Sequence, residues 1–259
     1  MRGENKMKKN MLICFVYLPI CLAIVFSANA KMDSIVGVWT FDKDNDTSDI
    51  SGNGHNGKAE GKVKWVNGKF GKAIELDGAS AVIIEHANDM NLQTFTLMAW
   101  VNIPNPPTDW WTIAAKDGWP NRNYGLWLAS GTGLAHHSWT SGGAPNNNAI
   151  NAVTPVVPKE WFHVAGTYDM KESKLYINGK LDAKGSFGDK PNVTDVQFIM
   201  GRTSNGSYKY SGAIDEVGLF NKALSEEDIN LIMKSGMIAA TSVNPRTKLA
   251  TTWANVKSN

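Results

Sequence analysis

The chain of 259 residues contains only two cysteines, Cys14 and Cys21, and both lie in its first 30 residues. The remainder has no thiol, which excludes disulfide bonds, thiolate metal sites and cysteine nucleophiles there. A surplus of positive charge is also missing. Four basic residues and one acidic residue fall in the first 30, so 22 basic and 23 acidic residues remain and their net charge is −1. With no basic patch or stripe, the sequence argues against nucleic acid as a partner.

No apolar run in the chain is long enough to favour a membrane-spanning helix. The longest run, over residues 11–26, follows four basic residues and precedes the small residues Ala28-Asn29-Ala30. This order is typical of a secretory signal peptide. We therefore expect residues 1–30 to be removed and the protein to be secreted or extracytoplasmic, with no membrane insertion after cleavage. An uncleaved anchor is the alternative.

Short alternating apolar runs recur between residues 73 and 220 and are separated by polar turn residues. This spacing is typical of an all-β sandwich. The run at 94–102 is apolar on both faces, as expected of a central strand that is covered on both sides. Asn178-Gly179 stands between two such runs and predicts a hairpin turn, because both residues tolerate a positive φ.

One helix is predicted near the C-terminus. Ser225 can cap it, Asp228 completes a short capping box, and Gly236 can end it. Beyond the helix, residues 240–259 show no periodicity except at 249–253, so they form either a tail or a late edge strand. We expect one domain over residues 31–239.

The histidines do not form an obvious metal site. His136 and His137 are adjacent, so on a strand they would point to opposite faces of the sheet and could not share one ion. His163 lies on an alternating run beside Trp161, where a structural role within the sheet is expected.

Five motifs occur in an order that resembles a known family: Gly-Val-Trp-Thr-Phe-Asp at 37–42, Gly-Lys-Ala-Ile-Glu-Leu-Asp-Gly at 71–78, Trp-Phe-His-Val-Ala-Gly-Thr-Tyr-Asp at 161–169, Lys-Leu-Tyr-Ile-Asn-Gly-Lys at 174–180 and Gly-Ala-Ile-Asp-Glu-Val at 212–217. Together they are similar to the laminin-G-like jelly roll of the concanavalin A-like lectin and glucanase superfamily. The resemblance covers about residues 36–236. It implies an antiparallel two-sheet jelly roll with one short helix, in a secreted protein that recognises sugars.

The resemblance also implies a structural Ca²⁺. Residues 49–57, Asp-Ile-Ser-Gly-Asn-Gly-His-Asn-Gly, resemble the glycine-rich loop of the same family. Jelly rolls of this superfamily often hold a Ca²⁺ between the first strand, this loop and the acid of the last strand, which here suggests Asp42, Asn53 and Asp215. Ca²⁺ takes six to eight oxygen ligands, which carboxylates and loop carbonyls supply. The alternative is that Asp215 hydrogen-bonds the neighbouring turn without a metal.

Two segments, 104–123 and 138–158, are rich in Pro, Gly and Asn and are expected to be long loops. Recognition is often placed on such loops. Four tryptophans lie in or beside them, where a core role is hard to arrange, and amides accompany these rings. We expect the carbohydrate-binding surface to consist of Trp110, Trp111, Trp119, Trp139, Asn121 and Asn123.

The predicted function is therefore a non-catalytic module that binds a glycan or polysaccharide. An adhesion module with a protein partner is one alternative, and a glycoside hydrolase or polysaccharide lyase of the same fold is another. The Glu-x-Asp-x-Glu pattern of the related endoglucanases is absent, and glycoside hydrolysis needs two carboxyls at a defined separation. Lyases of this fold carry no short signature. We predict no catalytic residues.

Overall fold

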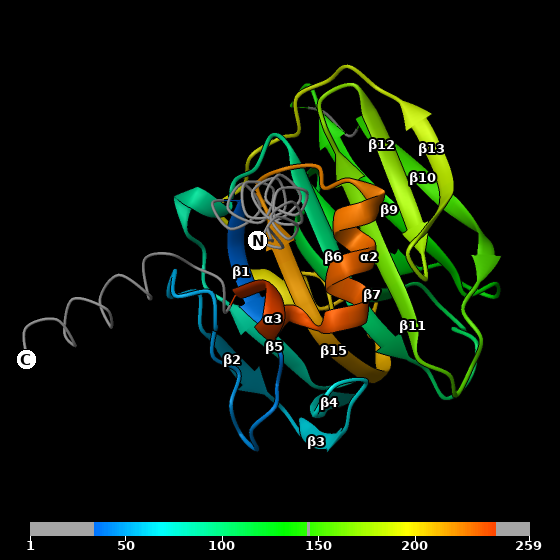
Figure 1. Cartoon of the computed structure of the whole chain (residues 1–259). Coiled ribbons are helices and arrows are strands. Elements are labelled where there is room, and N and C mark those ends of the chain that lie inside the picture. Colours follow the sequence, from blue (N-terminus) through cyan, green and yellow to red (C-terminus); the bar gives the residue numbers. More distant parts are fainter. Residues whose placement is uncertain (1–33, 144–145, 242–259) are drawn as a thin grey trace, which may run out of the picture. The chain divides into compact units, whose positions relative to one another are not determined.

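The computed structural model describes residues 34–143 and 146–241. The predicted signal peptide and most of the predicted tail lie outside the described residues. The described chain forms two antiparallel sheets (Figure 1), which confirms the predicted jelly-roll sandwich. Sheet A has the strand order β13 (Lys180–Ser186), β12 (Glu172–Ile177), β11 (Phe162–Tyr168), β6 (Phe95–Asn102), β15 (Ser211–Phe220), β4 (Lys72–Asp77) and β3 (Lys64–Asn67), with β1 (Ile35–Trp39) also paired to β15.

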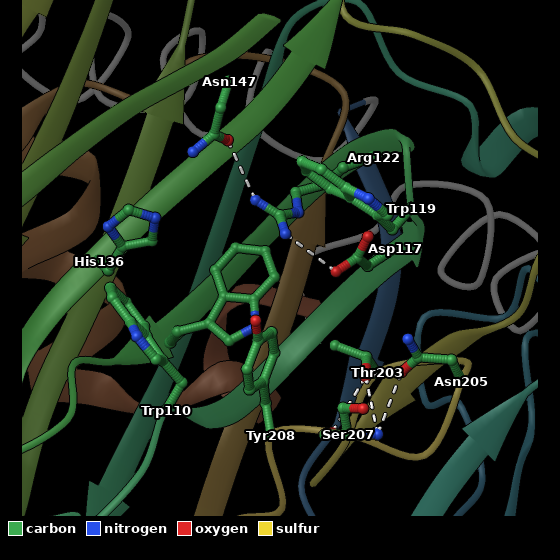
Figure 2. Close-up of a pocket in the computed structure, with 11 residues that line it drawn as sticks. Trp110, Asp117, Trp119, Arg122, His136, Asn147, Thr203, Asn205, Ser207 and Tyr208 are labelled. Carbon is green, nitrogen blue, oxygen red and sulfur yellow. Dashed lines mark hydrogen bonds and ion pairs between the residues drawn. The ribbon is translucent and has the colours of Figure 1, made fainter. Parts of the chain in front are cut away.

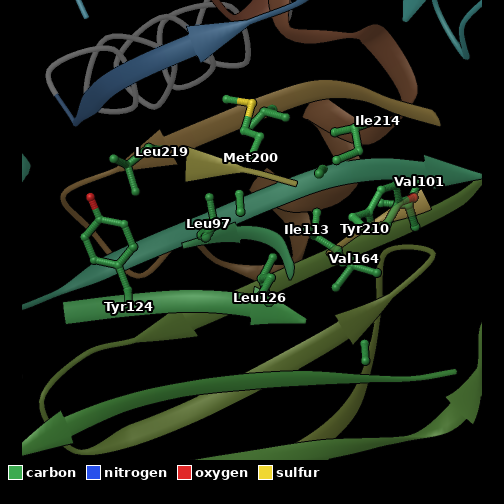
Figure 3. Packing of buried hydrophobic residues seen from close by; sticks show 14 of the residues in the cluster. Leu97, Val101, Ile113, Tyr124, Leu126, Val164, Met200, Tyr210, Ile214 and Leu219 are labelled. Carbon is green, nitrogen blue, oxygen red and sulfur yellow. The ribbon is translucent and has the colours of Figure 1, made fainter. Parts of the chain in front are cut away.

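Sheet B packs against sheet A and supplies the other half of the sandwich. Its strand order is β10 (Asn146–Pro155), β9 (Leu134–Ser141), β8 (Asn121–Leu128), β7 (Trp111–Gly118), β14 (Phe198–Met200), β5 (Ala81–Ile84) and β2 (Gly57–Glu60). Between the sheets, alternate residues of facing strands form one apolar core (Figure 3). Leu97 and Ile214 of sheet A, and Ile113 and Leu126 of sheet B, have no exposed surface in this core.

The outer face of sheet A is partly covered by helix α2 (Glu226–Ser235), which the short helix α3 (Met237–Thr241) follows. Ile229 and Ile232 of α2 pack with Met98 and Phe220 of the sheet in a second apolar cluster. The helix begins and ends as predicted: the Ser225 side chain accepts a hydrogen bond from the backbone N–H of Asp228, and Gly236 follows the last turn. Within the described residues, no helix is long and apolar enough to cross a membrane.

The hairpin and the central strand are also confirmed. Asn178 and Gly179 have φ values of 48° and 76° and join β12 to β13, as a type I′ turn requires. Strand β6 lies between β11 and β15, and seven of its eight residues are buried.

The two predicted long loops are largely wrong. Residues 111–118 and 121–128 form the paired strands β7 and β8, and residues 134–141 and 146–155 form β9 and β10. Several of the glycines and asparagines in these segments lie at turns, such as Gly142 and Gly143, or on the outer face of sheet B, such as Asn147. Their composition resembled that of loops because this face has many polar side chains and carries no helix in the described chain.

The strands β10 and β13 end their respective sheets on the same side of the sandwich. The carboxylate of Asp182 on β13 joins the two edges. It accepts hydrogen bonds from the backbone N–H of Val153 at 2.6 Å and of Thr154 at 3.2 Å, and from the Thr154 hydroxyl at 2.5 Å.

Candidate functional site

A cleft of about 430 Å³ lies at the outer face of sheet B (Figure 2). Its floor comes from the strands β7 to β10, and its opposite wall is the segment between β14 and β15. Both aromatic and polar side chains line it. The lining residues are Trp110, Asp117, Trp119, Arg122, Trp127, His136, Asn147, Thr203, Asn205, Ser207 and Tyr208.

The floor is organised by an ion pair between Arg122 and Asp117. Nη2 of Arg122 lies 3.1 Å from Oδ2 of Asp117, and both side chains are almost fully buried. Nη1 donates to the Ser138 hydroxyl at 2.7 Å and to Oδ1 of Asn147 at 3.2 Å. A charge buried to this degree needs such partners, because desolvation without compensation is costly.

The same guanidinium also contacts two aromatic rings. Its Cζ atom lies 4.4 Å from the Trp127 ring centroid and 5.8 Å from that of Trp119, within the range of cation–π attraction. Trp127 is buried, whereas the Trp119 side chain is 57% exposed. Arg122 therefore holds one indole in the floor and supports another at the rim.

His136 closes the other end of the floor between two indoles. Its ring stands edge-on to Trp110 at 4.8 Å and to Trp127 at 5.9 Å. Burial, together with the nearby charge of Arg122, lowers the pKa of His136 to about 4, so the ring is neutral at physiological pH. Nδ1 lies 2.7 Å from Oδ1 of Asn151. With that oxygen as acceptor, Nδ1 carries the proton and Nε2 is left as an acceptor.

The opposite wall is a polar turn that ends in an aromatic residue. The Thr203 hydroxyl donates to Oδ1 of Asn205 at 2.7 Å, and the backbone N–H of Ser207 donates to the same Asn205 oxygen at 3.1 Å. Tyr208 follows with φ 54°, a conformation that is uncommon for a bulky residue. Its carbonyl accepts a hydrogen bond from the backbone N–H of Thr112 at 2.8 Å, which fixes the turn to β7.

The structure brings two of the predicted sugar-binding residues, Trp110 and Trp119, to this cleft. Trp111 is half-buried and stands edge-on to Tyr210 at 5.7 Å, outside the lining set. Asn121 is also outside it, and its Oδ1 accepts a hydrogen bond from Asn192.

The predictions for Trp139 and Asn123 are wrong. Both side chains are fully buried. Trp139 is paired to Asn148 within sheet B, and its ring faces the core, where it lies 4.2 Å from the Tyr168 ring. The Asn123 amide bonds the backbone N–H and carbonyl of Leu92, which is a structural role.

Several lining residues could not be identified from the sequence, among them Asp117, Arg122, Trp127 and Tyr208. The sequence did contain one useful signal, the adjacent pair His136 and His137. As predicted, His136 and His137 point to opposite faces: His136 lines the cleft, and His137 packs edge-on against Phe95 in the core.

The three predicted calcium ligands do not come together. The Asn53 amide donates to the carbonyls of Ile35 and Val36, at the start of β1, whereas Asp42 follows the end of that strand. Asp42 and Asp215 both border the turn at residues 68–71. Asp215 accepts from the backbone N–H of Lys69 and Phe70, and Asp42 from that of Lys72. Among the described residues, no group of three or more His, Cys, Asp or Glu side chains is arranged to hold a metal.

A second depression, of about 520 Å³, lies at sheet A near the ends of β4, β6 and β15. It has one aromatic side chain, the half-buried Trp161, and a rim with Lys62, Lys64 and Lys159. Lys64 is paired with Glu75 at 3.7 Å. With a single aromatic ring, this depression is a poorer platform for a sugar than the cleft on sheet B.

The two antiparallel sheets, with one apolar core between them, define a concanavalin A-like β-sandwich. Residues 76–230 match the laminin G-type family described as the concanavalin A-like lectin/glucanases superfamily, and the chain belongs to this family. Paraclostridial mosquitocidal protein 1 of Paraclostridium bifermentans is 22% identical over 241 residues, a match that covers 82% of this chain and 17% of that protein. The chain thus spans a small part of this curated relative.

Solved structures of other proteins share the fold, two of them with a TM-score of 0.64. One is domain 4 of AbnA, a GH43 extracellular arabinanase from Geobacillus stearothermophilus, in complex with arabinotriose, with a TM-score of 0.64, 22% identity and coverage of 77% of this chain and 98% of that chain. The other is the binding domain of Paraclostridial mosquitocidal protein 1, with a TM-score of 0.64, 18% identity and coverage of 79% and 53%.

Proposed function

We propose that the protein is an exported, non-catalytic module that binds a glycan in the cleft on sheet B. One observation carries this proposal: four aromatic residues, Trp110, Trp119, Trp127 and Tyr208, line one cleft together with amide and hydroxyl groups. Sugar rings present apolar C–H faces flanked by hydroxyls. Aromatic rings can cover those faces while the polar groups bond the hydroxyls.

The relatives support a binding role. The arabinanase domain was solved with arabinotriose, and the mosquitocidal protein region is a binding domain. These properties belong to those proteins, and at such low identity their structures share only the fold with this chain. The cleft itself supplies the argument for this chain.

The chemistry of the cleft favours binding over catalysis. Of the eleven described residues that line it, Asp117 alone is acidic, and its carboxylate is engaged by Arg122. Glycoside hydrolysis needs a second carboxyl group. Elimination at a uronic acid would need a cation free to neutralise the substrate carboxylate, and Arg122 already serves Asp117.

Replacing the exposed Trp119 by alanine should weaken glycan binding by about tenfold to a hundredfold, since burying an aromatic face contributes on the order of 1 to 3 kcal/mol. A glycan array with residues 31–259 would identify a sugar, and isothermal titration calorimetry would then compare the variant with the wild type. Trp161→Ala, in the depression on sheet A, is the matched control and should retain wild-type affinity.

Unchanged affinity in Trp119→Ala would count against the cleft. A blank array, combined with capture of a specific protein, would favour the adhesion alternative. Turnover of any polysaccharide, followed by reducing ends or unsaturated products, would overturn the non-catalytic assignment.

We also propose a structural Ca²⁺ at the turn of residues 68–71, held by Asp42 and Asp215 with carbonyl oxygens. Burial, together with the charge of the neighbouring Glu216, raises the pKa of Asp215 to about 8. Burial raises the pKa of Glu216 to about 7, with a contribution from the charge of Asp42. Buried carboxyls that repel one another in this way would be stabilised by a cation. Asn53 has no part in this site.

Chelation of calcium should therefore lower the melting temperature, because an ion that binds only the folded state stabilises it by mass action. We expect a fall of several degrees when EGTA replaces about 1 mM Ca²⁺, measured by differential scanning calorimetry. In Asp42→Asn the response should be lost. A wild-type melting temperature that is the same with and without calcium would show that the site does not exist.

A further inference from the structure

We propose that the cleft selects uncharged saccharides and discriminates against uronic and sialic acids, because the Asp117–Arg122 ion pair leaves no cation available to an anionic ligand. This inference rests on the proposed function, since it names the class of glycan that the same cleft binds.

The hydrogen bonds of Arg122 show how little of its guanidinium is available. Arginine recognises carboxylates through two parallel N–H groups that form a fork. Here Nη1 donates to Ser138 and Asn147, and Nη2 donates to Asp117. Nε is fully buried and makes no hydrogen bond. A carboxylate could therefore not be bound by the fork unless Asp117 were displaced.

The aromatic contacts limit Arg122 further. With its Cζ atom within cation–π range of Trp119 and Trp127, the guanidinium is packed against the rings that form the platform. It is 7% exposed. Arg122 is therefore a positioning residue, which supports the two indoles and is not offered to the ligand as a charge.

The remaining lining residues add no charge. His136 is neutral at physiological pH, and the other eight are aromatic, amide or hydroxyl side chains. The net charge of the lining is therefore zero, and the only anion in it is Asp117. A ligand carboxylate would lose hydration in the cleft without gaining a free cation, and the desolvation of an unpaired charge is costly.

Matched pairs of oligosaccharides test this selectivity in the wild-type protein. Each pair has the same length and linkage and differs only at C6, as galactose and galacturonic acid or glucose and glucuronic acid do. We expect the neutral member of any bound pair to bind at least about tenfold more tightly. We also expect its affinity to be nearly independent of sodium chloride, since no ion pair with the ligand is formed.

Two variants examine the cause. Asp117→Asn leaves Arg122 without its counter-charge. The affinity for the acidic member should therefore rise by about tenfold or more, and this affinity should fall as the concentration of sodium chloride rises. The double variant Asp117→Asn/Arg122→Gln restores a neutral cleft and should regain the preference for the neutral member. Glu160→Gln, which removes an exposed acid outside the cleft, is the matched control and should leave the selectivity unchanged.

Circular dichroism must show that each variant is folded, because Asp117 and Arg122 are buried. If Asp117→Asn fails to fold, the inference is still tested by two measurements on the wild type: its selectivity between the members of each pair and the salt dependence of its affinity. Tighter binding of acidic members by the wild type, or an affinity that falls steeply with salt, would overturn the inference while leaving glycan binding intact. Absence of binding to every pair, and to a wider glycan array, would overturn the proposed function and this inference with it.

Discussion

Replacing Trp139 by alanine is expected to lower the free energy of unfolding by about 3 to 5 kcal/mol, as for other fully buried aromatic residues. The indole has no exposed surface and packs against Tyr168 at 4.2 Å, Phe187 at 5.0 Å and Phe95 at 6.3 Å. Alanine would leave a cavity among rings that belong to both sheets and to the chain beyond β13. Urea unfolding followed by circular dichroism measures the loss.

The matched control is the same substitution at Trp119. Its side chain is 57% exposed at the rim of the cleft, so Trp119→Ala should change the free energy of unfolding by no more than about 1 kcal/mol. Equal destabilisation by the two variants would contradict the structural difference between these tryptophans. So would a Trp139→Ala protein as stable as the wild type.

Acidification should destabilise the fold through its buried histidines. Burial lowers the pKa of His137 to about 4 and of His163 to about 3, whereas an unfolded histidine titrates near 6.5. The unfolded chain thus binds more protons below pH 6.5. The stability from these residues is complete above that pH and is lost as the pH falls toward the folded pKa values. Between about pH 7 and pH 5 each histidine should remove about 2 kcal/mol, and the two together about 4 kcal/mol.

Other groups oppose this trend, so the measurement compares variants with the wild type. The pKa values of Asp215 and Glu216 are raised to about 8 and 7 by burial, so these carboxyls stabilise the folded state as the pH falls. Urea unfolding of His163→Asn at about pH 7 and pH 5 should show a loss smaller than that of the wild type by about 2 kcal/mol. Met98→Leu does not titrate and should change stability equally at both values. An unaltered pH dependence in His163→Asn would contradict the prediction.

The sequence predicted the features that local chemistry determines. The positive φ values of Asn178 and Gly179, and the bond from Asp228 to the Ser225 hydroxyl, each depend on residues a few positions apart. The order of the sequence motifs along the chain then indicated the family, and through the family the fold.

The cleft could be predicted only in part because its geometry is not local. Its walls bring Trp110 beside residues that lie more than 90 positions further along the chain, such as Tyr208. A β-bulge adds a second difficulty. Lys116 pairs with Tyr124 and Asp117 with Arg122, so one extra residue stands in β8. Tyr124 therefore points into the core and Arg122 into the cleft, although strict alternation would place both on one face.

Trp139 illustrates the opposite error. Glycines and asparagines around it indicated a loop, yet its backbone pairs with Asn148 across the turn at Gly142 and Gly143. Pairing and burial override composition in such a segment, because a tryptophan facing the core contributes more than the weak strand propensity of its neighbours costs.

The Asp182 carboxylate affects the tendency of this domain to aggregate through the edge of its sheet. An edge strand with free backbone amides is a template on which another chain can add a strand, and aggregation starts from such edges. The edge at β10 carries Val153, whose side chain is 75% exposed. If the backbone amides of this edge were free, a strand of another molecule could pair with it. Asp182 occupies two of these amides and places a negative charge beside them. At this edge, therefore, the addition of a strand from a neighbouring molecule is disfavoured even when many copies are crowded together.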